Sequence, residues 1–113
     1  MAIARFDFLR TVGFATITAA YTPLGTPLAR NWRAFAFTNT SNATLFISFD
    51  GTTDNIVIPA NSFKLYDLAA NSADVGDAAG LIMQLNTQIS VKYLTAPTSG
   101  SVYVEALYVR NVL

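Results

Sequence analysis

The sequence predicts an all-β fold: a single-domain antiparallel β-sandwich or jelly roll of about eight strands with an extended N-terminal arm. Apolar residues alternate with polar ones instead of recurring every three or four positions, which is the pattern of strands. The alternating segments are short and are bounded by Gly, Pro, Asn and Ser. The chain has 113 residues, and a single domain commonly has about 100 to 150. We therefore expect one core.

The first 31 residues differ from the rest. Charged and aromatic residues alternate in ARFDFLRTVGF, and Pro23, Gly25 and Pro27 punctuate YTPLGTPLARN. Proline fixes φ and removes an N–H donor, so this spacing favours extended chain. We divide the chain into an N-terminal arm or first strand with a Pro-rich connector, 1–31, and a β-sandwich domain, 32–113. Residues 1–31 are compatible with an ordinary strand and long loop, or with an extension that packs on a neighbouring subunit.

The alternating segments predict strands in a definite order. Asn, Ser and Thr supply turn chemistry between them at 39–44 and 96–101. The Ala-rich stretch 68–80 contains Gly76 and Gly80 and is compatible with a short helix or an ordered loop. The predicted strands are 12–20, 32–39, 44–49, 55–58, 62–68, 81–85, 87–94 and 101–109.

Strand side chains point alternately to the two faces of a sheet, so the pattern also predicts which residues face the core. In TLFISF the core residues are Leu45, Ile47 and Phe49. In the last strand one face is apolar, and the other mixes an aromatic, two aliphatics and a glutamate. This mixed face suits an intersubunit contact better than free solvent. The two sets are Val102, Val104, Ala106 and Tyr108 against Tyr103, Glu105, Leu107 and Val109.

The composition predicts a subunit of an assembly. Apolar residues make up 52% and charged residues 12%, against a typical charged fraction of about 25%. A small domain cannot hide so much apolar sequence without leaving exposed patches, which mark partner interfaces. Seven basic residues balance seven acidic ones and are scattered, so no nucleic-acid footprint is visible. Polar residues break every apolar run before membrane-spanning length, so no membrane partner is expected. Charges at Arg5, Asp7 and Arg10 do not suit a signal peptide, and we expect use without secretion.

The residue inventory leaves little for catalysis. The chain has no His and no Cys, which removes the commonest general base, the commonest metal ligand and the thiol nucleophile. Asp67 and Glu105 are the carboxylates placed within predicted strands and would be the pair for glycoside cleavage, but a small sandwich offers little cleft. We predict a protein that is not an enzyme and has no catalytic residues, no cofactor and no small-molecule substrate.

The acidic stretch DGTTDN permits two interpretations. Asp50, Thr52 and Asp54 stand at the first, third and fifth positions of a calcium-loop pattern, but Asn55 replaces its glycine and Asn61 its final glutamate. Asp-Gly between two apolar segments is also the residue pair of a β-turn with positive φ. The turn is the better interpretation, and no metal site is predicted, although a cation at 50–54 stays open.

The aromatic residues are open to a double interpretation as well. Trp32, the sole tryptophan, is expected to anchor the core or an interface rather than to stack on sugar. The five tyrosines are compatible with a carbohydrate-binding face, but in strands they more often pack with the hydroxyl in water. Those tyrosines are Tyr21, Tyr66, Tyr93, Tyr103 and Tyr108.

The runs NWRAFAFTNTSNATLFISFDGTTDNIVIPANSFKLYDLAAN and QISVKYLTAPTSGSVYVEALY resemble small structural proteins of tailed-bacteriophage virions. The phrases TNTSNATLFISFDG, IPANSFKLYDL and SVKYLTAPTSGSVYVEALY carry the resemblance, which spans 31–108. It implies a β-sandwich or jelly-roll module that forms trimers or larger rings. The first thirty residues match nothing in this family.

The resemblance implies a capsid decoration, or cement, protein on the capsid surface of the virion, made in the host bacterial cytoplasm. Such a protein forms a homo-oligomer, here a trimer, and bridges subunits of the phage major capsid protein. Alternatives are a neck, tail or fibre component and a carbohydrate-binding module. Apolar and aromatic anchors dominate interfaces of this kind, and the residues expected to supply them are Phe6, Phe8, Leu9, Trp32, Tyr103, Leu107, Val109, Val112 and Leu113.

Overall fold

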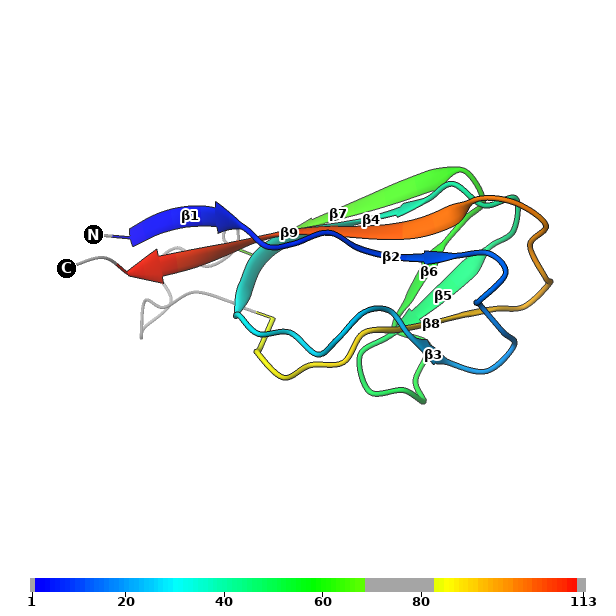
Figure 1. The fold of residues 1–113 in the computed structure, drawn as a ribbon, viewed down its shortest axis with the longest axis horizontal. Helices are drawn as coiled ribbons and strands as arrows, with labels where there is room; N and C mark the ends of the chain where they lie inside the picture. Colours follow the sequence, from blue (N-terminus) through cyan, green and yellow to red (C-terminus); the bar gives the residue numbers. More distant parts are fainter. Residues whose placement is uncertain (1, 69–82, 112–113) are drawn as a thin grey trace.

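The computed structural model describes residues 2–68 and 83–111, which form two antiparallel sheets packed face to face (Figure 1). The predicted all-β sandwich is confirmed. The described residues contain no helix, and so none there has the length and apolar character to cross a membrane.

The larger sheet has five strands and is organised around the long last strand. That strand, β9, takes β1 along its second half, where Phe6 pairs with Leu107, and β2 along its first half, where Arg10 pairs with Val104. On its other side lies β4, followed by β7. The paired ends of β1 and β9 project beyond the sandwich (Figure 1). The strands are β1 (Ala2–Phe6), β2 (Arg10–Gly13), β4 (Trp32–Asn39), β7 (Ser62–Asp67) and β9 (Ser101–Asn111).

The smaller sheet has four strands in the order β3, β8, β5, β6. Its central pair places Phe46 opposite Lys92 and Ile47 opposite Val91. The short β3 adds an edge strand next to β8, with two residues, Thr22 and Pro23, in the pairing. The strands are β3 (Thr22–Pro23), β5 (Leu45–Ser48), β6 (Ile56–Ile58) and β8 (Ser90–Tyr93).

The core lies between the sheets and follows the alternation of the sequence. Along β4 the side chains of Phe35 and Phe37 point inward, and their rings meet edge to face at 5.7 Å between centroids. Leu45 and Ile47 of β5 face them and are fully buried, as predicted. Phe49 was expected in the core but is half-buried at its margin, because the strand ends one residue earlier and the chain turns away.

Several predicted strands have different bounds. The strand expected at 12–20 is wrong: β2 ends at Gly13, a turn follows in which the Thr16 amide donates to the Gly13 carbonyl at 3.0 Å, and Ile17 is buried from a loop. The strand expected at 87–94 begins only at Ser90. Of the strand expected at 81–85, the described part makes an isolated bridge between Met83 and Trp32. The helix or loop expected at 68–80 lies, except for its first residue, outside the described residues.

Residues from the first part of the chain supply β1, β2 and β3 to the two sheets. The alternation of charged and aromatic residues there belongs to strands that pair with β9. The division of the chain at residue 31 stays a prediction.

Candidate interaction surface

The side of the five-stranded sheet that faces away from the core, which we call the long face, is built by the same alternation that builds the core. Partners on β7, β4 and β9 form rows across the sheet, and β4 contributes only small side chains to them. Phe6 of β1 extends the last row because it pairs with Leu107. The rows are Phe63, Thr38 and Tyr103; Leu65, Ala36 and Glu105; and Asp67, Ala34 and Leu107.

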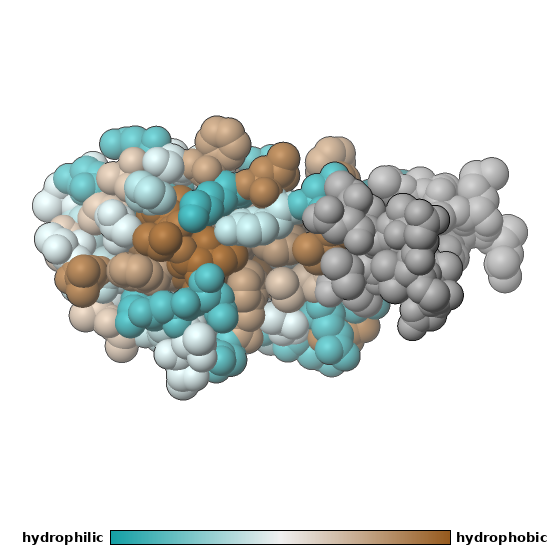
Figure 2. All heavy atoms as spheres, turned by 180° about the vertical axis from the view of Figure 1, so that it is seen from behind, coloured by the Kyte–Doolittle hydropathy of each residue, from teal (hydrophilic) through white to brown (hydrophobic). Residues whose placement is uncertain are grey.

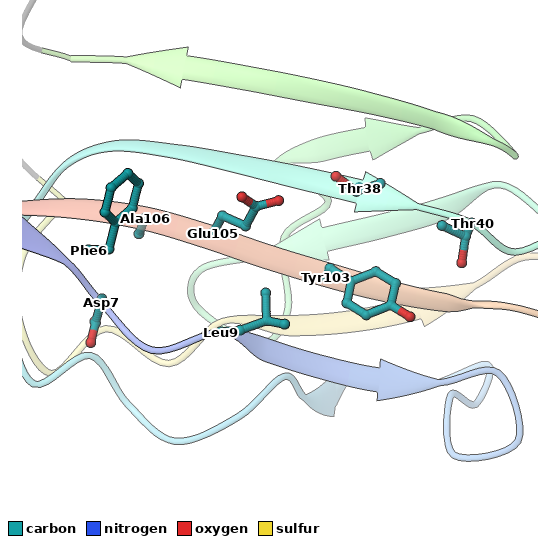
Figure 3. A pocket seen from close by; sticks show the side chains of 8 residues that line it. All are labelled: Phe6, Asp7, Leu9, Thr38, Thr40, Tyr103, Glu105 and Ala106. Carbon is teal, nitrogen blue, oxygen red and sulfur yellow. The ribbon is translucent and has the colours of Figure 1, made fainter.

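Two adjoining hollows lie on the long face, one on each side of Glu105. The larger, of about 450 Å³, is lined by Phe6, Leu9, Thr38 and Tyr103 among others (Figure 3). The smaller, of about 130 Å³, lies over the alanines of β4. The hollows exist because small side chains on β4 stand between larger ones on the flanking strands. They are shaped to receive side chains of another molecule.

The long face is mainly apolar and open. Phe6 is 79% exposed, Phe63 68% and Leu65 65%. Soluble monomers rarely expose contiguous apolar patches above a few hundred Å². Glu105 stands among these side chains, and within the described residues no hydrogen bond or ion pair reaches its carboxylate. Apart from the long face, the view from behind in Figure 2 shows a patch of apolar side chains bordered by polar ones.

A buried polar cluster fixes the chain between β1 and β2, which carries Phe6 and Leu9. The Trp32 indole Nε1 donates to Asp7 Oδ2 at 2.8 Å, and Arg10 Nη1 donates to the same oxygen at 3.3 Å. Arg10 also donates through Nε to the Thr26 carbonyl and lies 5.0 Å from the Trp32 ring centroid. The cluster ties the edge of the long face to the core beneath it.

The environment of Asp7 stabilises its charged form. Partial burial acts to raise its pKa, but hydrogen bonds from Trp32 and the Phe8 amide, together with the charge of Arg10, hold the pKa below its usual value. Asp7 and Arg10 are both nearly inaccessible, so the pair is a structural ion pair. It presents no reactive group to solvent.

The acidic stretch after β5 forms a turn, as the sequence predicts. One oxygen of Asp50 accepts hydrogen bonds from the amides of Thr52 and Thr53 and from the Ser48 hydroxyl. These bonds hold its pKa far below the usual range although the group is exposed. Gly51 has a φ of 82°, the conformation that favours glycine there.

The second aspartate of that stretch, Asp54, contacts side chains next to the four-stranded sheet and makes no contact with Asp50 that the structure shows. Asp54 accepts a hydrogen bond from the Tyr21 hydroxyl and pairs with Lys92 Nζ at 3.2 Å. These contacts lower the pKa of Asp54, while burial and the nearby carboxylate raise that of Tyr21. Among the described residues no group of three potential metal-ligating side chains occurs.

The two strand carboxylates do not converge. Asp67 pairs with Ala34 and Glu105 with Ala36, so they lie in different rows with β4 between their strands. Two strand spacings alone separate them by about 10 Å. Chemistry with two carboxylates flanking one glycosidic bond does not suit this arrangement.

The tyrosines also lie apart from one another. Tyr66 stacks on Phe35 at 5.4 Å, Tyr108 lies beneath the Arg30 guanidinium, and Tyr21 contacts Lys92. Tyr103 lines the larger hollow of the long face. Tyr93 belongs to β8 and pairs with Leu45. With these different neighbours, the five tyrosines form no common platform for a sugar ring.

Four of the predicted interface residues come together around the two hollows: Phe6, Leu9, Tyr103 and Leu107. Phe8 lies against the Arg10 guanidinium at 4.1 Å and is 56% exposed. Trp32 is completely buried, which corrects its place among interface residues: it supports the long face from beneath and cannot touch a partner. The side chain of Val109, and Val112 and Leu113 as a whole, lie outside the described part.

Sequence reasoning missed the contribution of β7. Phe63 and Leu65 alternate in SFKLYD, and this alternation marks them as one face of a strand. It does not indicate which neighbour the strand has. Pairing with β4 places both residues on the long face.

No protein-family model matches the sequence, and no curated protein matches it. Among solved structures, the chain is similar to the SPP1 Dit protein, described as a paradigm of the hub adsorption apparatus in Gram-positive infecting phages, with 12% identity and a TM-score of 0.42. The match covers 96% of this chain and 49% of that one, so the chain spans about half of its length. A likeness of this size carries no argument about function. What the fold and the surface define is an all-β sandwich with an open apolar face.

Proposed function

We propose that this chain is a non-enzymatic structural subunit of a bacteriophage particle, which associates with other subunits through the long face. The exposed apolar surface around Glu105 carries the proposal, because burial in an assembly would remove Phe6, Phe63 and Leu65 from water. The resemblance of 31–108 to small virion proteins supplies the context.

The finer role has two versions that differ in copy number. A capsid decoration protein, the first version, forms a trimer and bridges major capsid protein subunits on the outside of the head. A neck, tail or fibre component, the second, builds a ring or spike. Symmetry gives the first version hundreds of copies per particle and the second on the order of a dozen to a few dozen.

Quantitative mass spectrometry of purified particles tests both levels of the proposal. The chain is expected in the particles, and its ratio to the major capsid protein selects the version. A Leu65→Asp variant should be lost from particles, since it places a charge on the long face. Leu85→Asp is the matched control, because Leu85 is 41% exposed in the loop before β8, away from that face. Particles without the wild-type chain would refute the proposal.

A further inference from the structure

The four-stranded sheet has an outer face of its own, which we call the short face. Phe46 pairs with Val57 on one side and with Lys92 on the other, so the three share this face. Leu94 lies one residue beyond the end of β8, at the end of this face, and is 79% exposed. The short face thus combines apolar side chains, one of them protruding, with a single lysine.

The long and short faces are complementary in shape and in charge. The long face has a hollow of about 450 Å³ whose lining includes the carboxylate of Glu105. Leu94 is exposed at the end of the short face, one residue beyond β8, and Lys92 lies two residues before it, which is at most about 7 Å of backbone. When Leu94 enters the hollow, a lysine two residues away stands near the rim that carries Glu105.

Lys92 has capacity for a second carboxylate. Its ammonium pairs with Asp54 at 3.2 Å and lies 4.8 Å from the Tyr21 ring centroid. An ammonium group has three donors. Glu105 has no hydrogen-bonding or ionic partner among the described residues. A contact between the two faces would supply the missing partner.

Packing of the long face on itself lacks this complementarity. A two-fold contact brings the same patch of both molecules together. A two-fold contact centred near Glu105 would bring two carboxylates together in an apolar contact, where unpaired like charges are costly, and one centred elsewhere would bury each Glu105 without supplying a cation from the rows of this face. The long face therefore suits a different surface better than its own copy.

We infer that the long face of one molecule binds the short face of a second copy of this chain. Leu94 of the second copy fills the larger hollow, and its Lys92 pairs with Glu105 of the first. The contact is head-to-tail, because each molecule offers one face to each of two neighbours. Such contacts close into rings or continue as filaments. This inference rests on the proposed structural role and specifies how the subunits join.

A charge-reversal experiment tests the inference on the purified chain. In Glu105→Lys both faces carry lysine, and in Lys92→Glu both carry glutamate, so the self-association of each variant should be weakened. Each should show a dissociation constant about ten-fold or more above that of the wild type. Mixed in equal amounts, the two variants should associate again, because each contact then joins one lysine to one glutamate. Analytical ultracentrifugation measures all three samples.

Two further variants guard against misfolding as an explanation. Leu94→Asp should weaken self-association without lowering the thermal midpoint, since Leu94 is largely exposed in the single chain. Leu85→Asp, outside both faces, should leave association unchanged. Restored association in the mixture excludes misfolding of either charge variant.

Three outcomes would overturn the inference: a wild-type chain that stays monomeric at high concentration, charge variants that associate like the wild type, or a mixture that stays dissociated. Each leaves the proposed function intact if the chain is still found in particles. Conversely, a chain that associates head-to-tail but is absent from particles would refute the proposed function alone.

Discussion

The outer faces of the two sheets differ in whether their charged residue has a partner among the described residues of the chain. The long face leaves Glu105 without a described partner among exposed apolar side chains. The short face carries a lysine that is already paired with Asp54 and covered in part by Tyr21. The charge on the long face has no partner among the described residues, whereas the charge on the short face has a first partner in the turn that follows β5.

This difference separates groups that stabilise the fold from groups available to a partner. The carboxylates of Asp7 and Asp50 find their hydrogen-bond partners within the chain and behave as structural elements, although Arg10 Nη2 in the Asp7 cluster is buried without a hydrogen-bond partner. The Asp7 cluster holds the edge of the long face in place, but the exposed side chains of that face take no part in the cluster. Substitutions in the clusters should therefore change stability, whereas substitutions on the long face should change association.

The largest difference is expected between two turn glycines, Gly100 next to the five-stranded sheet and Gly51 next to the four-stranded sheet, in the unfolding free energy that alanine costs at each. At Gly100, before β9, φ is 88° and an added Cβ would lie 2.3 Å from the Thr40 carbonyl oxygen. Gly100→Ala should cost more than about 4 kcal/mol of unfolding free energy, or prevent folding. At Gly51, after β5, nothing lies within 4 Å of an added Cβ, and alanine should cost about 1–2 kcal/mol from φ alone. Urea unfolding compares them, and similar losses would contradict the close packing at Gly100.

The two sides of the five-stranded sheet should respond differently to the same truncation. Phe37 is fully buried, and Phe37→Ala should cost about 3–5 kcal/mol of unfolding free energy. Phe63 is 68% exposed, and Phe63→Ala should change that free energy by no more than about 0.5 kcal/mol. Denaturant titration of dilute protein measures both. A large loss for Phe63→Ala in the monomer would mean that the long face is part of the fold.

The ion pair under the long face should make stability sensitive to acid. Asp7 has a lowered pKa in the folded chain, so its contribution is complete above its unfolded pKa of about 3.9 and is lost as pH falls through the folded value. Asp7→Asn leaves Arg10 buried without a counter-charge and should cost about 3 kcal/mol at neutral pH. Thermal unfolding from pH 7 to pH 2 should show a flatter acid dependence for the variant. An unchanged slope would contradict the prediction.

The turn beside the short face should give the smallest effect. Asp50 is exposed and its pKa is also lowered, so its contribution follows the same sign and disappears in acid. Asp50→Ala removes the acceptor of the Thr52 and Thr53 amides, which water can replace. The thermal midpoint should fall by less than for Asp7→Asn, as measured by circular dichroism. A larger fall would reverse the comparison of the two clusters.

Much of the fold follows from local pattern. Alternation places Leu45 and Ile47 in the core and Tyr103, Glu105 and Leu107 on the opposite face of the last strand, because neighbouring side chains of a strand must point to opposite sides. Alternation alone misled at 12–20, where buried Ile17 belongs to a loop.

The sequence by itself determined that the chain is all-β, that Asp50 and Gly51 make a turn, and that the last strand has one mixed face. Only the tertiary structure decided that β1 and β2 share β9, that Trp32 lies beneath the surface, and that Phe63 and Leu65 join Glu105 on one face. The physical reason is the range of the interactions. Side-chain parity and turn conformation are set by adjacent residues, whereas strand neighbours are set by pairing between segments far apart in the chain.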